Sequence, residues 1–99
     1  MNEKTTLVVT AVPNPQKMAS VQQYLKGVMP LFVAAGGMLV KRLKVNEVIG
    51  GSASGMVLVM DFESDEAITS LFNSDEYAAL IPARDEGFTE MNILLTHSM

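Results

Sequence analysis

The chain contains 99 residues, of which 48% are hydrophobic and 18% are charged, and its formal net charge is -4 at pH 7. A chain of this length forms one domain, so residues 1–99 are expected to share a single core. The acidic balance excludes the basic surface that nucleic-acid binding requires, and the apolar runs are shorter than the roughly 20 residues of a membrane span. The absence of cysteine excludes disulfides and Cys-based zinc sites. Because the first residues also lack a signal-peptide pattern, we expect a cytoplasmic protein.

The first half of the chain is predicted to contain a strand, a helix and a second strand. Residues 5–12 are β-branched and apolar, as is typical of a strand, and a proline follows them. In residues 14–35 apolar side chains recur three and four positions apart, which predicts a helix with Asn14 as its cap and Pro15 as its first residue. A double glycine ends this helix, and residues 38–49 are predicted to form the second strand.

The second half is predicted to contain a loop, a third strand, a second helix in two pieces and a fourth strand. The hairpin loop is expected at residues 50–55 and the third strand at 56–63. The two helical pieces are expected at 64–72 and 74–81, and the fourth strand at 88–97. Ser64 is the expected cap of the helix. Pro82 is expected to end its second piece, after which residues 83–87 form a polar connector.

The order β-α-β-β-α-β is typical of an α+β domain with a ferredoxin-like arrangement, in which two helices cover one face of a four-stranded antiparallel sheet. The strand at residues 56–63 is apolar on both faces, with Val57 and Val59 on one and Leu58 and Met60 on the other. Because the helices cover only one face, and large exposed apolar patches are rare on monomers, the open face is expected to pack against a second copy. We therefore expect a homodimer.

Several landmark residues are spread over nearly the whole chain. They are Tyr24, Pro30, Gly36, Gly37, Arg42, Asp61, Phe62, Ser64, Ser74, Asp75, Glu76, Tyr77 and Arg84. This pattern, with a double glycine before a strand and a Ser-x-x-Tyr segment followed by an arginine, resembles the bacterial family known as domain of unknown function thirteen-thirty. The resemblance implies a dimeric α+β barrel, in which two four-stranded sheets meet face to face. It implies no particular activity, because the family has none agreed.

Arg84 is the first candidate for a functional residue. It follows Pro82 in the predicted connector, where a guanidinium would hold a carboxylate or phosphate through two parallel hydrogen bonds. The alternative is a structural ion pair with one of four acids, which are Asp61, Glu63, Asp85 and Glu86.

Asp61 is the candidate general base. It follows an apolar stretch of the third predicted strand, and an ionised carboxylate inside the barrel would be costly unless it were paired. The alternative is an ion pair at the end of the strand with Lys41, Arg42 or Arg84. The sequence leaves these alternatives open.

The other candidates are two tyrosines, an arginine and the single histidine. Tyr24 and Tyr77 would donate phenolic hydrogen bonds to a ligand between the helices and the sheet, or else would pack with buried rings and solvated hydroxyls. Arg42 is a further candidate for ligand binding. His97, the only histidine, excludes a metal site built from several imidazoles and is expected to be a solvated residue near the chain end. No cofactor or metal is expected.

These residues support two hypotheses of function. In the first, a small apolar or carboxylate-bearing molecule binds in a pocket of the homodimer. Under this hypothesis the homodimer, if it is an enzyme, would also catalyse cofactor-independent proton transfer on the bound molecule. Asp61 would act as the base, Arg84 would bind the anion and a tyrosine would donate a hydrogen bond. In the second, the protein is a non-catalytic module for ligand sensing or assembly, and its polar residues hold the dimer together. Whether the protein is an enzyme stays open at this stage.

Overall fold

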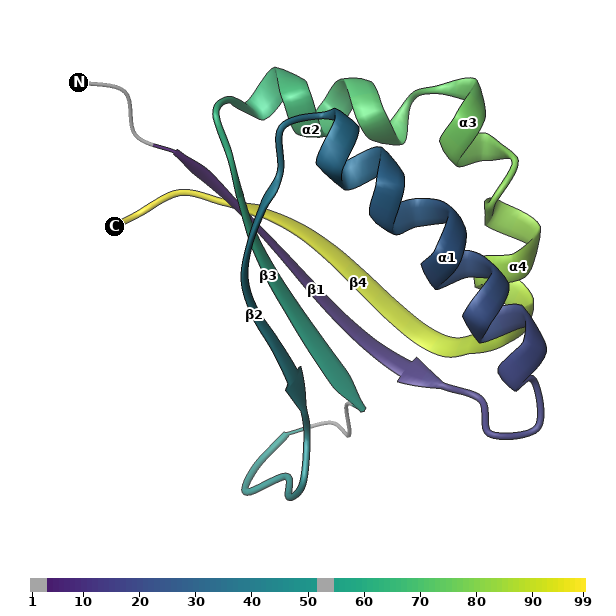
Figure 1. Cartoon of the computed structure of the whole chain (residues 1–99). Helices are drawn as coiled ribbons and strands as arrows, with labels where there is room; N and C mark the ends of the chain where they lie inside the picture. The colour runs from purple at the N-terminus through teal and green to yellow at the C-terminus, as the bar shows by residue number, and fades with distance from the viewer. Residues whose placement is uncertain (1–3, 52–54) are drawn as a thin grey trace.

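The computed structural model describes residues 4–51 and 55–99, and residues 52–54 of the predicted hairpin loop lie outside this part. Its elements are β1 (Thr5–Pro13), α1 (Met18–Ala34), β2 (Met38–Lys44), β3 (Met56–Phe62), α2 (Asp65–Phe72), α3 (Asp75–Ala78), α4 (Ile81–Gly87) and β4 (Phe88–Thr96). The strands form one sheet in the order β2-β3-β1-β4, and each neighbouring pair is antiparallel. The helices lie on one face of this sheet (Figure 1). The predicted α+β arrangement is confirmed, with three helices, α2, α3 and α4, in place of the predicted second helix in two pieces.

The core lies between the helices and the face of the sheet that they cover. Leu7 of β1 and Met60 and Phe62 of β3 are at most 1% exposed. The buried residues of α1 follow one another at spacings of three or four positions, and they are Val21, Tyr24, Val28 and Phe32. Side chains at this spacing form one stripe along a helix, so α1 buries a continuous apolar stripe against the sheet.

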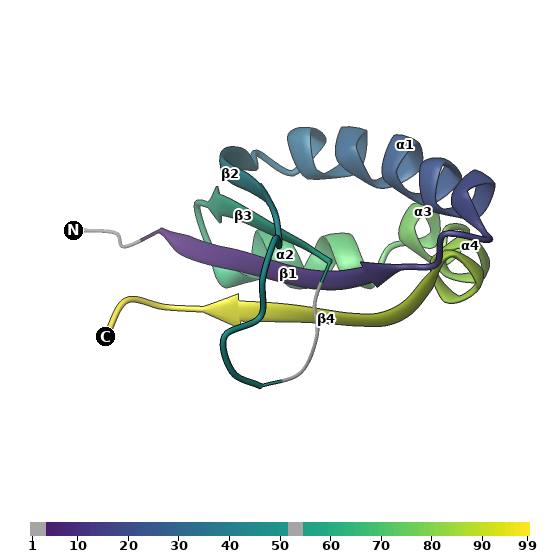
Figure 2. The ribbon, with the colours of Figure 1, turned by 90° about the horizontal axis from the view of Figure 1, so that it is seen from below.

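The opposite face of the sheet carries no helix in the described part of the chain, and β2 and β4 are its edge strands (Figures 1 and 2). The strand register and the alternation of side chains place on this face Thr6, Val8, Thr10, Val12, Met38, Lys41, Leu43, Val57, Val59, Asp61, Glu90, Asn92 and Leu94. We call it the open face. Met38, Leu43 and Leu94 on its edge strands are 54%, 48% and 46% exposed, so apolar side chains lie uncovered across it.

The first helix starts later than predicted. The side chain of Asn14 accepts a hydrogen bond from the N–H of Gln16 at 3.0 Å, and its carbonyl accepts one from the N–H of Lys17 at 2.9 Å. These bonds close a turn, because a short Asx side chain readily bonds to the backbone two residues on. Asn14 therefore stabilises a turn instead of capping the helix, and α1 begins at Met18.

The second strand is shorter than predicted and irregular. It covers Met38–Lys44 in place of residues 38–49. Its register against β3 shifts between Leu39 and Lys41, which is the mark of a β-bulge. The bulge places Leu39 on the helix side of the sheet and Leu43 on the open face, although simple alternation assigns both to one face.

The predicted connector at residues 83–87 is instead part of a helix. α4 covers Ile81–Gly87, and Pro82 lies in its first turn, so the prediction that this proline ends a helical piece is wrong. Proline is tolerated there because the first N–H groups of a helix have no partner within the helix. Arg84 is consequently held on a helix and not in a loop.

Asp65 ties the end of β4 and the start of β1 to α2. It follows Ser64, whose hydroxyl accepts a hydrogen bond from the N–H of Ala67 at 3.2 Å, so the predicted cap is confirmed. The Asp65 carboxylate accepts a hydrogen bond from the Thr5 hydroxyl and contacts Nε2 of His97, both at 2.6 Å. His97 is a solvated residue near the chain end, as expected, since its side chain is 55% exposed, and the contact with Asp65 holds it to α2.

The double glycine ends α1 as predicted. Gly36 has a φ of +86°, in the left-handed region that favours glycine, and its N–H donates to the carbonyl of Val33 at 3.0 Å. The N–H of Gly37 donates to the carbonyl of Phe32 at 2.8 Å. A Cβ atom on Gly37 would lie 2.7 Å from Cζ of Phe62, so the core packs directly against this backbone.

We expect Gly37→Ala to destabilise the fold by about 1–3 kcal/mol, the usual cost of overpacking a tight core. The added methyl would displace either the Phe62 ring or the Phe32 carbonyl, which would be 2.8 Å away. Gly50→Ala is the matched control, because a Cβ atom on Gly50 would have no atom of the other described residues within 4 Å. Urea denaturation of both variants measures the difference, and equal stabilities would contradict the close approach at Gly37.

We also expect the contribution of Asp65 to disappear in acid. The hydrogen bond from Thr5, followed by that from His97, lowers the pKa of the Asp65 carboxyl below its ordinary value. A carboxyl with a lowered pKa in the folded state stabilises the fold above its unfolded pKa, and this stabilisation is lost as the pH falls through the folded pKa.

The native protein should therefore be more stable than Asp65→Asn at about pH 5, and the advantage should vanish progressively as the pH falls below about 4. Denaturation curves recorded over this pH range measure the difference in unfolding free energy between the native protein and Asp65→Asn. Asp75→Asn is the control, because Asp75 lies at the corresponding position of α3 and is also exposed. An identical pH dependence for the two variants would show that the bonds to Thr5 and His97 contribute nothing.

Candidate functional site

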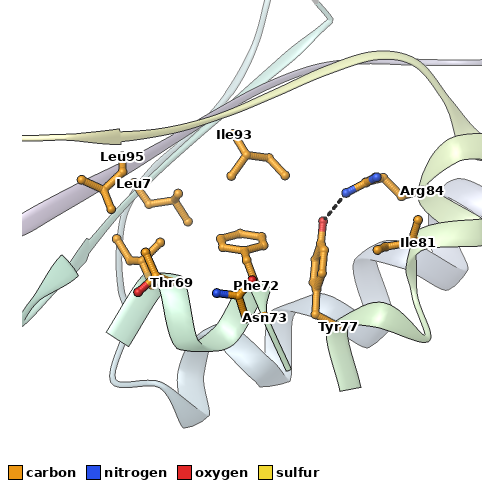
Figure 3. A pocket seen from close by; sticks show the side chains of 10 residues that line it. Leu7, Thr69, Phe72, Asn73, Tyr77, Ile81, Arg84, Ile93 and Leu95 are labelled. Carbon is orange, nitrogen blue, oxygen red and sulfur yellow. Dashed lines mark hydrogen bonds between the residues drawn. The ribbon is translucent and has the colours of Figure 1, made fainter. Parts of the chain in front are cut away.

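A pocket of about 390 Å³ lies between the helices and the sheet, next to β4. Its apolar lining comes from β1, α2, α4 and β4, through Leu7, Ile68, Phe72, Ile81, Ile93 and Leu95. Its polar lining consists of Thr69, Asn73, Tyr77 and Arg84. The Tyr77 hydroxyl and the Arg84 guanidinium meet at one end, and Thr69 and Leu95 lie toward the other (Figure 3). We call this cavity the Arg84 pocket.

Arg84 is anchored by two side chains. Its Nη1 donates a hydrogen bond to the Tyr77 hydroxyl at 3.1 Å, and its Nε donates to Oδ1 of Asp85 at 3.2 Å. Burial disfavours the charged guanidinium, but the bonds to Tyr77 and Asp85 outweigh it and raise the pKa of Arg84. The side chain is 26% exposed, and within the described part of the chain Nη2 has no hydrogen-bond partner. Arg84 thus forms an ion pair with Asp85, one of the four acids considered, and has one nitrogen without a hydrogen-bond partner among the described residues.

Tyr24 of α1 and Tyr77 of α3 share a hydrogen bond. Their hydroxyl oxygens are 2.9 Å apart, and the residues are only 4% and 2% exposed. The expectation of solvated hydroxyls is therefore wrong. Burial, followed by the hydrogen bond with Tyr77, raises the pKa of Tyr24, which keeps its phenol protonated.

The direction of this bond follows from the need to satisfy buried hydrogens. Arg84 can only donate, so the Tyr77 oxygen accepts its bond. If Tyr77 donated to Tyr24, the hydrogen of the Tyr24 hydroxyl would be buried without an acceptor among the described residues, which is costly. Tyr24 is therefore the donor. The hydroxyl hydrogen of Tyr77 then has no acceptor among the described residues, and Tyr77 lines the Arg84 pocket.

Aromatic packing holds both rings in place. Tyr77 packs edge to face against Phe72, with ring centroids 4.7 Å apart, and Tyr24 packs in the same way against Phe88 at 5.6 Å. Such pairs contribute about 0.5–1.5 kcal/mol beyond simple burial. The packing of both rings therefore fixes the positions of the two hydroxyls.

Asp61 lies on the other side of the sheet. Its carboxylate accepts a hydrogen bond from the Thr6 hydroxyl at 2.7 Å, and Asp61 is paired with Thr6 and with Met38 on the open face. The neighbouring Leu7 points the opposite way and lines the Arg84 pocket. Within the described residues no ion pair joins Asp61 to a basic side chain. The structure therefore separates Asp61 from Arg84, which the sequence hypotheses combined in one site.

Arg42 and His97 also lie outside the Arg84 pocket. Arg42 is exposed on β2, where it is paired with Leu58, and His97 follows the end of β4. In residues 4–51 and 55–99, no group of three or more His, Cys, Asp and Glu side chains is placed to hold a metal ion. No helix in the same part of the chain has both the length and the apolar character to cross a membrane.

A second hollow of about 470 Å³ adjoins the Arg84 pocket. It is lined by Arg84, Asp85, Phe88, Thr89, Glu90, Met91 and Ile93, so it shares Arg84 and Ile93 with that pocket. Because four consecutive residues of β4 line it, the hollow follows the backbone edge of the strand and not one face of the sheet. We call it the β4-edge hollow. Its lining is more polar than that of the Arg84 pocket.

The sequence indicates Tyr77 and Arg84 as candidate residues of the Arg84 pocket, but neither Thr69 and Asn73 nor the apolar wall. Helical spacing assigns Phe72 and Ile81 to packing, because it does not distinguish a side chain facing the core from one lining a cavity. Residues 72, 77, 81 and 84 follow one another at spacings of three to five positions. That pattern is visible in the sequence, but the angles between α2, α3 and α4 depend on the turns between them.

Several solved structures share this fold. A protein of unknown function from Rhodopseudomonas palustris is 12% identical, with a TM-score of 0.83 over 100% of this chain and 85% of that one. A dimeric protein of unknown function and ferredoxin-like fold from Bacteroides fragilis is 10% identical, with a TM-score of 0.63 over 96% of each chain. A dimeric ferredoxin-like protein of unknown function from Thermobifida fusca is 9% identical, with a TM-score of 0.62 over 99% of this chain and 93% of that one. These likenesses show the ferredoxin-like fold.

The sequence itself shows the family. No protein of curated function matches the chain. The family described as domain of unknown function (DUF1330) matches residues 5–99, which include every landmark residue on which the resemblance rested. The resemblance is thus confirmed over nearly the whole chain, and this protein belongs to the DUF1330 family.

Proposed function

We propose that this protein is a homodimer that binds a small, mostly apolar organic molecule in the Arg84 pocket. The observation that carries the proposal is the pair of hydrogen-bond donors at one end of an otherwise apolar cavity. These donors are the Tyr77 hydroxyl and Nη2 of Arg84, and both belong to side chains already held by other contacts. Apolar lining with a few convergent polar groups is the usual composition of a small-molecule site.

The two donors favour a ligand with an acceptor oxygen, such as a carbonyl or a carboxylate. A hydrogen bond to such an oxygen contributes about 0.5–1.5 kcal/mol, and more when a charged group takes part. The apolar part of the ligand would lie against Phe72 and Ile81, where burial contributes about 25 cal/mol per Å². The ligand would therefore be oriented with its oxygen toward Arg84.

Binding without catalysis is the function that the geometry favours. Among the described residues that line the Arg84 pocket there is no Asp, Glu or His, so this lining offers no carboxylate or imidazole base. Asp61, proposed from the sequence as the base, is on the open face and bonded to Thr6. Acid/base chemistry with Asp61 and Arg84 would require both to reach the same ligand. A non-catalytic ligand-binding module requires only the pocket.

The open face supports the homodimer. Lys41 and Glu90 lie on the edge strands β2 and β4. Two pairs of the other polar side chains are bonded to each other, since Thr6 donates to Asp61 at 2.7 Å and Asn92 donates to Thr10 at 3.1 Å. Covering these groups would therefore leave few unpaired polar atoms, which is the main cost of burying a polar surface. The apolar residues between them would be removed from water. Two of the similar structures are described as dimeric, which agrees with this proposal.

The dimer is tested by placing a charge on the open face. Val59→Lys would bury an unpaired ammonium between the two sheets and is expected to produce monomers. Val33→Lys is the control, because Val33 is 67% exposed on α1, away from the open face. Light scattering at micromolar concentration distinguishes the two states. A native monomer, or a dimer that survives Val59→Lys, would contradict the proposed interface.

The ligand site is tested with two probes that differ in one polar group. We expect calorimetry to show saturable binding of both 3-phenylpropanamide, which carries an acceptor oxygen, and propylbenzene, which does not. Tyr77→Phe should weaken the amide about fivefold, corresponding to roughly 1 kcal/mol for one hydrogen bond, and leave propylbenzene within about twofold.

Ser70→Ala provides the protein control, because Ser70 is on α2 but does not line the Arg84 pocket. Each variant is first checked for a cooperative unfolding transition, so that loss of binding is not loss of fold. If neither probe binds the native protein, or if Tyr77→Phe binds the amide as tightly as the native protein does, the proposed site is wrong.

A further inference from the structure

We infer that the preferred ligand carries a cationic nitrogen next to its acceptor oxygen, as a hydrophobic α-amino acid with a free amino group does. This inference rests on the proposed function, because it concerns the ligand of the Arg84 pocket. It assigns a role to the β4-edge hollow, which the proposed function leaves unused. It follows from the residues that the two cavities share and from the charges around them.

The two cavities meet at Arg84, so a ligand bound to its guanidinium has access to both. On one side lies the apolar wall with Phe72 and Ile81. On the other side lies the β4-edge hollow, whose lining includes Asp85 of α4 and, from the edge strand β4, the open-face residue Glu90. From the Arg84 pocket to the β4-edge hollow, the lining therefore changes from apolar residues to hydrogen-bond donors and then to acidic residues.

The charges around the β4-edge hollow disfavour a simple carboxylate. Its lining contains two acids, Asp85 and Glu90, and one base, Arg84, so one negative charge is in excess. Arg84 is already paired with Asp85 at 3.2 Å. Within the described residues Glu90 has no ion-pair partner. The excess negative charge would repel a ligand carboxylate bound at Arg84. An ammonium group next to that carboxylate would neutralise the excess charge.

An α-amino acid matches this order of environments. Its apolar side chain would occupy the Arg84 pocket, and its carboxylate would accept hydrogen bonds from Tyr77 and Arg84. Its ammonium, one carbon away from the carboxylate, would lie in the β4-edge hollow near Asp85 and Glu90. Thr89 also lines that hollow, and its hydroxyl donates to the Val12 carbonyl at 3.2 Å, so its oxygen remains an acceptor for an ammonium.

The test compares L-phenylalanine with 3-phenylpropanoate, which differ only by the α-ammonium group. We expect calorimetry at low ionic strength to show phenylalanine binding about fivefold more tightly, the effect of one partly solvated ion pair. In Glu90→Gln, and separately in Asp85→Asn, the ratio should fall to about twofold or less. Added salt at about 0.5 M should also reduce the ratio, because the acids are exposed.

Glu63→Gln is the matched control, because Glu63 is exposed and lines neither cavity; it should keep the native ratio. If 3-phenylpropanoate binds as tightly as phenylalanine, or if the ratio survives both variants, the inference is wrong and the proposed function stands. If neither compound binds and 3-phenylpropanamide also fails, the proposed function itself is wrong. The two failures are thus distinguishable.

Discussion

The sheet has apolar side chains on both faces but helices on only one, and the rest of the molecule is arranged around this imbalance. β1 and β3 lie in the centre, so their helix-side residues, such as Leu7 and Met60, are fully buried. The same strands present Val8 and Val59 on the open face. Within the described residues no further element covers them, and the hydrophobic effect acts on both faces alike. In the proposed homodimer, a second copy provides the missing layer.

The candidate site lies where the helices cover their face of the sheet incompletely. α1 has 17 residues and buries a continuous stripe, whereas the remainder of that face is covered by three short helices. Short helices that meet at angles leave space between them and the edge strand β4, and this space is the Arg84 pocket. Tyr24 and Tyr77 bridge α1 and α3 there. The hydrogen bonds that satisfy their buried phenols also orient a donor into the pocket.

The charged residues divide between the two sides of the sheet. Asp61 is held by Thr6 on the open face, and Arg84 is held by Tyr77 and Asp85 near the β4 edge. Asp61 and Arg84, which the sequence hypotheses combined in one site, therefore lie in different parts of the molecule. The acids that accompany Arg84 come from α4 and β4, which explains why the ligand proposal includes an ammonium as well as an acceptor oxygen.

The order of strands and helices was determined by the sequence alone, because the periods of apolar residues in strands and helices are local properties. The Ser64 cap and the double glycine after α1 were predictable for the same reason. Local reasoning failed at Pro82, since proline both ends helices and starts them, and at the bulge in β2, which depends on pairing with β3. Only the tertiary structure decided the site. Tyr24 and Tyr77 are 53 positions apart, and the side of the sheet on which a polar residue lies depends on the register between strands.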